Sequence, residues 1–420
     1  MADASAATNP AIKDSQGLKQ RLKKAERRKK FEAVGLVMPL LALMIVFYFV
    51  PIAMMLYRSI DNKQMRTVLP RTADIIMAWD GNGLPGEPVY KALAADLKEA
   101  RKKHTIAKAA RRLNFDRAGF ASLISRTGRK VSRLDIDACQ SCKDTLIGID
   151  KRWGEKPWWT VMQRGLKDYT LLYLLSAVDL RYDLDNKIVR VPEEEAIYTS
   201  IIARTIYISA SVTLLCLLLG FPIAYYLAQA TPRVRNLLMI VLLLVFWTSL
   251  LVRTLSWILV LQDYGVVNSF LMWSGITSKP VPMVFNRFAV YVAMTHVLLP
   301  FMVLPLYSVM RVIPKSYVRA AHSLGATPFH AFWSVYVPQT LPGIGAGALM
   351  VFIQALGYYI TPALVGGPRD QMISYFVAFF VNERVNWSMA SALGLLLLVL
   401  TGTMYLLFGR KVNIANMKMG

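Results

Sequence analysis

Six separate apolar runs constrain this chain more than any other feature of its sequence. Each contains about 20 or more mostly apolar residues, which is the length that a helix needs to cross roughly 30 Å of hydrocarbon. The runs cover approximately residues 34–57, 202–228, 236–261, 288–310, 341–365 and 387–408. Because 55% of the 420 residues are hydrophobic, one soluble domain is hard to reconcile with the sequence. We expect an all-α membrane protein with six transmembrane helices.

Basic residues near the ends of these runs predict how the chain is oriented, because cytoplasmic loops carry an excess of Lys and Arg. The first run, 34–57, is longer than the apolar core of a signal peptide and is expected to be a retained anchor. If the basic block at residues 13–30 is cytoplasmic, several later bases fall on the same side: Arg233, Arg235, Arg311, Lys315, Arg319, Arg410 and Lys411. We therefore expect a cytoplasmic basic N-terminus at residues 1–33 and a cytoplasmic tail at residues 411–420.

The same alternation places residues 58–198 outside the cytoplasm, as an α-rich insertion between the first two spans. Periodicity predicts helices at about 90–110, 118–125 and 160–180. Trp153, Trp158 and Trp159 are expected to pack near the membrane interface. Cys139 and Cys142 form a C-x-x-C pair, for which a local disulfide or two idle thiols are preferred over redox catalysis or a zinc site.

The net charge of +23 lies in the N-terminal block and in the insertion, where acidic residues are interleaved with the bases. This distribution favours solvated faces and gives no reason to expect a nucleic-acid partner.

Residues 312–340, between the fourth and fifth spans of the expected core at 199–410, have the pattern of two short amphipathic helices. One face of the first helix would present Tyr317, Ala320, Ala321 and Leu324. One face of the second would present an aromatic stripe of Phe329, Phe332, Trp333 and Tyr336. Gly325 suits the end of the first helix, Thr327 an N-cap and Pro328 the first position of the second helix. Pro338 is expected to help end that helix. From periodicity alone, docking of another protein and packing against the transmembrane helices are equally favoured.

The sequence RAAHSLGATPF at residues 319–329, followed by Val337 and Pro338, resembles the EAA loop of binding-protein-dependent ABC importer permeases. The resemblance implies the type I ABC importer permease fold and a coupling helix that inserts into a groove of a cytoplasmic ATPase. It assigns the ATPase-coupling role to Arg319, Ala320, Ala321, Leu324, Gly325, Ala326 and Pro338. Arg319 stands where the family has Glu, a departure that bears on any ion pair of that Glu and on the charge of the partner groove.

Three further stretches look like the spermidine/putrescine-type permeases: LGFPIAYY at 219–226, FWTSLLVRTLSW at 246–257 and GYYITPALVGGPRD at 357–370. The resemblance covers the first span and residues from about 198 onward, but not the insertion. It implies a bacterial inner-membrane permease for a small organic solute. A polyamine is the first choice, and an amino acid, an opine or an aminophosphonate is the alternative.

The resemblance also implies the partners: an ABC ATPase dimer, a second permease subunit, an extracytoplasmic solute-binding protein and membrane lipid. No Walker A pattern G-x-x-x-x-G-K-[ST] occurs in the chain. We therefore expect a transport subunit without enzymatic activity or a cofactor, with ATP hydrolysis in a partner chain.

Charged and aromatic side chains within the spans are candidates for a translocation path: Trp247, Arg253, Trp257, Asp263, Tyr358 and Tyr359. Charge inside a membrane is costly, so Arg253 is expected to extend toward the outer interface, with pairing to Asp263 or contact with solute as the less favoured alternative. Aromatic rings suit a polyamine through cation–π contact, although most such rings simply pack. His296 and His322 lack metal-ligand spacing, so no metal site is expected.

An ion-coupled secondary transporter is the competing class of protein. It would be expected to bury carboxylates near the middle of the bilayer. Beyond residue 196 the only acidic residues are Asp263, Asp370 and Glu383, all near expected outer ends of spans. This distribution disfavours ion coupling.

Overall fold

The computed structural model describes residues 29, 32–135, 139 and 141–412, with side chains up to residue 407. Most of the basic block at 13–30, the side chains of Arg410 and Lys411, and the tail beyond residue 412 lie outside the described residues. The chain divides into two units, residues 1–57 and 58–420, which are described separately. Six described helical segments are long and apolar enough to cross a membrane: Glu32–Arg58, Tyr198–Gln229, Leu250–Trp273, Arg287–Val312, Pro328–Leu356 and Trp387–Leu407.

The first unit contains most of the helix Glu32–Arg58, which includes a π-helical turn. In this turn, η1 (Ile45–Phe49), the amide of Val50 donates to the carbonyl of Ile45, and α2 (Val50–Arg58) follows. Pro51 lies just beyond the turn and has no amide hydrogen to donate. A wider i→i+5 turn before a proline lets the helix continue past it.

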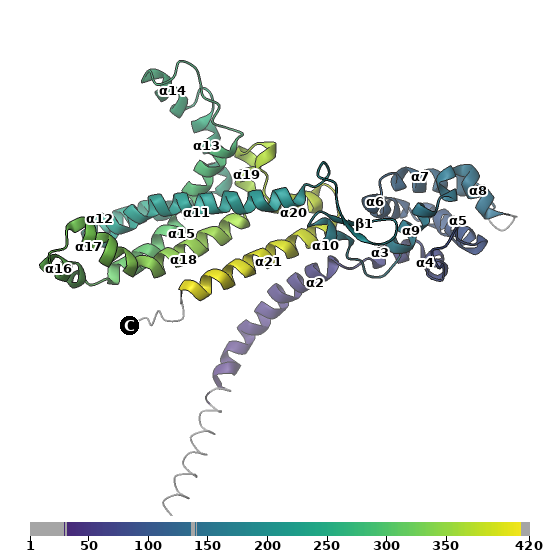
Figure 1. The fold of residues 1–420 in the computed structure, drawn as a ribbon, viewed down its shortest axis with the longest axis horizontal. Coiled ribbons are helices and arrows are strands. Elements are labelled where there is room, and N and C mark those ends of the chain that lie inside the picture. The colour runs from purple at the N-terminus through teal and green to yellow at the C-terminus, as the bar shows by residue number, and fades with distance from the viewer. Residues whose placement is uncertain (1–28, 30–31, 136–138, 140, 413–420) are drawn as a thin grey trace, which may run out of the picture. The chain divides into compact units, whose positions relative to one another are not determined.

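Three long helices of the second unit form its membrane core: α11 (Tyr198–Gln229), α15 (Arg287–Val312) and α18 (Val337–Leu356). They lie side by side in Figure 1. Contacts between Cys216 and Thr295, and between Gly220 and Met302, show that α11 and α15 run in the same direction. Gly347 meets Met302, and Gly343 meets Val309, so α18 runs the opposite way. The α15-to-α18 connection therefore lies at the end of this bundle opposite Tyr198.

Small residues let α18 approach α15 closely. A Cβ added at Gly347 would lie 2.8 Å from the sulfur of Met302 and 3.1 Å from its carbonyl oxygen. Membrane helices commonly use Gly at such contacts because lipid gives apolar side chains little reason to associate.

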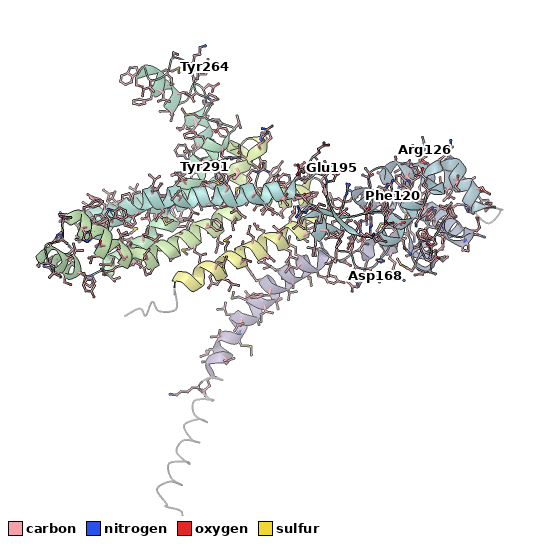
Figure 2. The ribbon with its side chains drawn as sticks, in the orientation of Figure 1. Phe120, Arg126, Asp168, Glu195, Tyr264 and Tyr291 are labelled. Atoms are coloured by element: carbon pink, nitrogen blue, oxygen red, sulfur yellow. The ribbon has the colours of Figure 1, made fainter. Side chains whose placement is uncertain are left out.

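Two of the predicted spans are wrong in their boundaries. The run 236–261 is not one helix: α12 (Pro232–Trp247) ends at Trp247, and α13 (Leu250–Leu261) begins after an extended Thr248 and Ser249. A turn and α14 (Val266–Trp273) follow, with Tyr264 exposed in the turn (Figure 2). The run 341–365 is also interrupted, because α18 stops at Leu356 and a separate α19 (Ile360–Val365) follows.

The remaining elements of the core follow α19 in the sequence. A 3₁₀ turn, η4 (Pro368–Asp370), leads into α20 (Ile373–Asn382) and the last helix α21 (Trp387–Val412). Residues of α20 and α21 form a cluster with Tyr173 and Ala177, so the end of the insertion packs on these helices.

The insertion is mainly α-helical, but the predicted helices are only partly correct. The stretch 90–110 breaks at His104, whose φ is +57°, into α5 (Glu87–Lys102) and α6 (Ile106–Asp116). The helix expected at 118–125 is α7 (Phe120–Val131), and 160–180 is not one helix but contains the end of α9 and the short α10. The other elements are α3 (Lys63–Val68), α4 (Pro70–Ile76), α8 (Cys142–Ile149), η2 (Lys151–Gly154), α9 (Lys156–Gly165) and α10 (Leu172–Ser176). Strands β1 (Leu180–Tyr182) and β2 (Ile188–Arg190) form a short antiparallel hairpin with Leu180 opposite Arg190.

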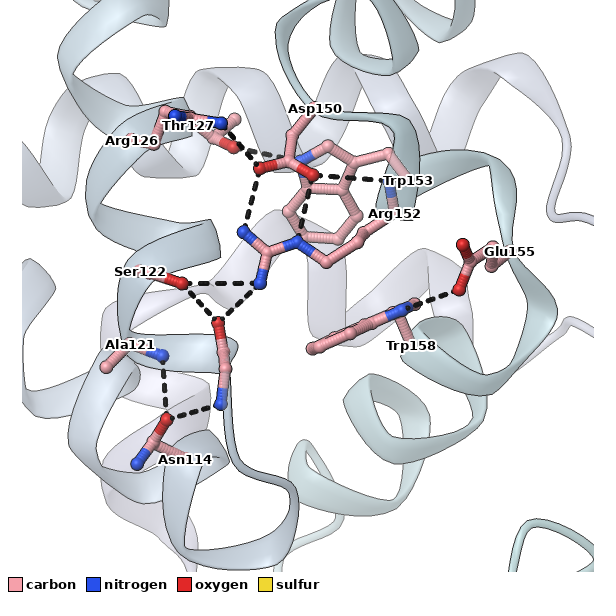
Figure 3. Close-up of polar contacts among 11 residues, drawn as sticks. Asn114, Ala121, Ser122, Arg126, Thr127, Asp150, Arg152, Trp153, Glu155 and Trp158 are labelled. Atoms are coloured by element: carbon pink, nitrogen blue, oxygen red, sulfur yellow. Dashed lines mark hydrogen bonds and ion pairs between the residues drawn. The ribbon is translucent and has the colours of Figure 1, made fainter.

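The tryptophans of the insertion occupy its own core, which corrects the expected place near the membrane interface. Trp153 and Trp159 are fully buried, and the ring of Trp159 meets Tyr90 edge-on with centroids 4.6 Å apart. The indole of Trp153 donates to Thr127, and that of Trp158 donates to Glu155 (Figure 3). The insertion therefore has a hydrophobic core separate from that of α11, α15 and α18.

Two backbone segments, near the first and the later residues of the insertion, meet at its base. Asp61 pairs with Tyr169, and the Asn62 side-chain amide donates to the carbonyls of Gly165 and Lys167. At the junction with the core, the carboxylate of Asp179 accepts hydrogen bonds from the amides of Ile197, Tyr198 and Thr199 at the start of α11. A carboxylate at a helix N-terminus satisfies amides that have no partner within the helix.

Cys139 and Cys142 are both free thiols in the structure. Burial, together with neighbouring Cys139, raises the pKa of Cys142 to about 12. A thiol with such a pKa is almost entirely protonated near neutral pH and is a poor nucleophile. Within the described ranges, no group of three or more His, Cys, Asp or Glu side chains is placed to hold a metal ion.

Candidate functional site

The strongest candidate site is the connection from α15 to α18, residues 312–340, which we name the coupling loop. It contains α16 (Lys315–Ser323), α17 (Pro328–Ala331) and a π-helical turn η3 (Phe332–Tyr336). Figure 1 shows α16 and α17 at one end of the bundle formed by α11, α15 and α18. This is the end away from Tyr198, where the insertion joins α11.

The turn between α16 and α17 has the geometry predicted from the sequence. Gly325 has a φ of +87°, and the Ala326 amide donates to the Ala321 carbonyl at 3.0 Å, which ends α16. The hydroxyl of Thr327 accepts from the His330 amide, and Pro328 occupies the first turn of α17. Glycine is favoured at Gly325 because side chains are strained at this φ.

The prediction that Pro338 helps end the second helix is wrong. Instead, α17, η3 and α18 run on without a break. The amide of Val337 donates to the Phe332 carbonyl, five residues back, and this wider turn lies immediately before Pro338. As before Pro51, the π-helical turn accommodates the missing amide hydrogen without breaking the helix.

Half of the aromatic stripe packs against the bundle and the other half is exposed, so the stripe combines the two alternatives that periodicity left open. Phe332 and Tyr336 pack on α11, with ring centroids 5.4 and 5.3 Å from that of Tyr225. Phe329 and Trp333 point away from the bundle and are 74% and 55% exposed. One half of the stripe thus fixes the coupling loop to the core, and the other half is free to contact another molecule.

Most of the predicted coupling residues are exposed, as Phe329 and Trp333 are. Leu324 is 89% exposed, and Arg319, Ala320 and Gly325 are exposed as well. Ala321 and Ala326 are half-buried, and Pro338 is exposed at the start of α18. Small side chains beside a protruding Leu permit close approach of a partner's backbone.

Three of the six path candidates come together around His296. The indole of Trp257 donates to the Nδ1 atom of His296 at 3.2 Å, and Arg253 is close enough to both His296 and Tyr358 for a Coulombic interaction. Trp247, Asp263 and Tyr359 are exposed. Among the described side chains no ion pair joins Arg253 to Asp263.

Arg253 instead stabilises the break between α12 and α13. Its guanidinium donates to the carbonyls of Thr248 and Ser249, at 3.2 and 3.4 Å. Backbone groups freed by a helix break at membrane depth need such partners. The Thr–Ser pair followed by Arg is the sequence signal that marks this break.

A second polar group, near the insertion end of the bundle, was missed by the sequence analysis. The Nε atom of Arg287, at the start of α15, donates to buried Asp370 at 2.9 Å, and the Arg204 guanidinium donates to the Arg369 carbonyl. Asp370 also accepts from the Gly367 amide. The side chain of Tyr291 lies one helical turn further along α15 (Figure 2). The signal was the presence of Asp370 among long acid-free segments.

The described helices of membrane-spanning length place the chain in the class of multi-pass membrane proteins, and an exposed two-helix projection lies at one end of the bundle. Residues 196–413 match the family described as binding-protein-dependent transport system inner membrane component. The chain belongs to this family: it is a permease subunit of an ABC importer in the inner membrane, and the ATPase of such an importer is a separate chain.

Individual relatives agree with this family. The chain is 34% identical over 225 residues to the spermidine/putrescine transport system permease protein PotB of Escherichia coli strain K12, covering 53% of this chain and 82% of PotB. It is 31% identical over 234 residues to the inner membrane ABC transporter permease protein YdcU of the same strain, covering 51% and 71%. The molybdenum transport system permease protein ModB of Mycobacterium bovis is 30% identical over 207 residues, with 49% and 76% covered.

Proposed function

We propose that this chain, together with a second permease subunit, forms the translocation path for a polyamine such as spermidine or putrescine. An ATPase dimer docks on the coupling loop from the cytoplasm, and a solute-binding protein delivers solute on the side of the insertion. Both chain ends are then cytoplasmic, and residues 58–198 are extracytoplasmic. Closure of the ATPases moves the coupling loop and switches the access of the path from one side to the other.

The observation that carries this proposal is the exposed face of the coupling loop. Leu324, Phe329 and Trp333 project from a segment that is itself fixed to α11 by Phe332 and Tyr336. A rigidly anchored projection can transmit force from a docked ATPase to the bundle, whereas a loose loop would absorb it. The small residues Ala320, Ala321 and Gly325 support the same interpretation, because they leave room for close contact.

The choice of a polyamine as the solute is supported by the similarity to PotB and by the aromatic side chains among the path candidates. Trp257 and Tyr358 can offer ring faces to an ammonium group. Carboxylates for a polyamine would then come from the solute-binding protein or the second permease, because the only charged side chain beside these rings in the described core is Arg253.

That same Arg253 favours a second class of solute, one that carries an anionic group beside its amine, such as an opine or an aminophosphonate. A guanidinium attracts carboxylate and phosphonate groups and repels ammonium groups. Ligand-induced thermal shifts of the solute-binding protein encoded with this permease distinguish the two classes. Stabilisation by spermidine or putrescine alone supports the polyamine, and stabilisation by opines alone contradicts it.

Replacing Gly325 tests the coupling function. A Cβ at this position meets nothing within 4 Å, so the effect of Gly325→Val is conformational and not steric. A β-branched residue at this positive φ costs about 1–2 kcal/mol or more, whereas Asn tolerates it better. We expect Gly325→Val to reduce solute-stimulated ATPase activity and uptake about tenfold or more, and Gly325→Asn to retain most of both. Membrane levels of the two variants should equal those of the wild type; unchanged uptake in Gly325→Val would refute the coupling function.

A further inference from the structure

The coupling loop is entirely basic in its charge. Residues 312–340 contain Lys315, Arg319, His322 and His330 but no Asp or Glu. The sequence has no acidic residue at all between Asp263 and Asp370. The core segments on either side of the coupling loop therefore offer no carboxylate that could neutralise it.

The bases lie on one face of α16. Lys315, Arg319 and His322 are spaced i, i+4 and i+7, and all three are exposed. No ion pair to Lys315 or Arg319 is found in the part of the chain that the structure describes. Within α16, the side-chain hydroxyl of Ser323 bonds only to the backbone carbonyl of Arg319. Like charges four residues apart weaken an isolated helix, so this stripe does not serve the stability of α16.

The basic stripe adjoins the exposed apolar side chains. Ala320 and Leu324 lie next to Arg319 on α16, and Phe329 follows across the Gly325 turn. Interfaces commonly combine a protruding apolar group with surrounding charges that meet opposite charges on the partner. The partner that covers Leu324 must therefore place its own side chains opposite Lys315 and Arg319.

We infer that the ATPase groove that receives this coupling loop is acidic, with at least one carboxylate opposite Arg319. The inference rests on the proposed docking of an ATPase at the coupling loop and adds the chemistry of the groove. Because Arg319 carries a positive charge, a groove that fits it has the opposite charge to one that would receive Glu at this position. The ATPase of this importer and permeases with Glu at this position should then assemble poorly with each other.

Charge reversal tests the inference in the intact complex, purified in mild detergent from cells that produce both chains. Arg319→Glu should lower the affinity for the ATPase about tenfold or more at low ionic strength, and the effect should shrink as salt screens the charges. Arg233→Glu is the matched control, because Arg233 is an exposed base at the start of α12, outside the coupling loop, and its reversal should leave the affinity unchanged. Reversing one acidic residue of the ATPase groove to Lys should restore assembly with Arg319→Glu and weaken assembly with the wild type.

The inference is overturned if the Arg319→Glu variant binds the ATPase as tightly as the wild type, or more tightly. If that variant also binds phosphatidylglycerol in nanodiscs more weakly, the stripe is assigned to anionic lipid instead.

Leu324→Asp separates this inference from the proposed function. If Leu324→Asp releases the ATPase while Arg319→Glu does not, docking at the coupling loop is correct and the acidic groove is wrong. If no ATPase co-purifies with the wild-type permease at any salt concentration, the proposed function itself is wrong.

Discussion

At the scale of single residues, several arginines link backbone segments through their guanidinium groups. Arg253 holds two carbonyls at a helix break, and Arg204 holds the carbonyl of Arg369. In the insertion, Arg152 donates to both oxygens of Asp150 and to the Gly119 carbonyl, and its guanidinium stacks on Trp158 (Figure 3). A planar group with five donors suits such junctions.

The pair of Arg152 and Asp150 predicts a dependence of stability on pH. The hydrogen bonds from Arg152 hold the pKa of Asp150 below its ordinary value of 3.8. A lowered carboxyl pKa stabilises the fold above the unfolded pKa, and this stabilisation is lost as the pH falls through the folded value. We expect Asp150→Asn to destabilise the insertion by about 1 kcal/mol at pH 7, and the difference from the wild type to shrink below about pH 4.

Thermal unfolding followed by tryptophan fluorescence measures this effect, because Trp153 and Trp158 lie beside the pair. Asp185→Asn is the control, since Asp185 is an exposed carboxylate in the hairpin between β1 and β2. An Asp150→Asn difference that stays constant from pH 7 to pH 3 would contradict the assignment of the pKa to Asp150.

At the scale of helices, the apolar runs predicted that spans exist but not where they break. Hydrophobic composition reports burial in lipid. It indicated six segments because a helix formed by each run is long enough to cross the hydrocarbon thickness of a bilayer. The break at Thr248–Ser249 is held by the nearby Arg253 guanidinium, a local contact that hydropathy does not register. The helices α13 and α19 that follow the two breaks meet through the Thr254–Thr361 hydrogen bond, a tertiary contact that no local pattern predicts. Pro338 misled the prediction because a π-helical turn, which has no periodic signature, lets the helix pass a proline.

The coupling loop was more predictable than the spans. Its turn depends on local chemistry, namely a glycine at positive φ, a threonine N-cap and a proline in the first turn of α17. The division of its aromatic stripe was not predictable, because only the folded bundle places Tyr225 against Phe332 and Tyr336. The Arg287–Asp370 pair joins positions 83 residues apart and is equally invisible in a pattern of local spacing.

Close packing of α15 and α18 gives a prediction for Gly347. Val at this position would place atoms against Met302, where even a Cβ lies 3.1 Å from the backbone oxygen. Overpacking of this kind costs about 1–3 kcal/mol, so Gly347→Val should lower the melting temperature of the purified complex by several degrees. Gly402→Val is the matched control, because a Cβ at Gly402 meets nothing within 4 Å. Equal melting temperatures for the two variants would mean that α15 and α18 do not meet at Gly347.

At the scale of the whole molecule, the directions of the helices separate the insertion from the coupling loop. Since α11 and α15 run in parallel, the insertion joins one end of the bundle and the coupling loop closes the other. An importer needs this separation, because solute arrives on one face of the membrane and ATP is hydrolysed at the other. The family match covers the core and the coupling loop but not the insertion, whose separate core of buried tryptophans is an addition to the permease.

The most direct test of this account is the sidedness of the two ends. Single cysteines replace Phe329 in the coupling loop and Lys91 on α5 of the insertion, in a chain whose Cys139, Cys142 and Cys216 are changed to Ser. A membrane-impermeant maleimide is applied to right-side-out and inverted membrane vesicles. The account predicts that Phe329→Cys is labelled only in inverted vesicles and Lys91→Cys only in right-side-out vesicles. Labelling of both positions from the same face of the membrane would contradict it.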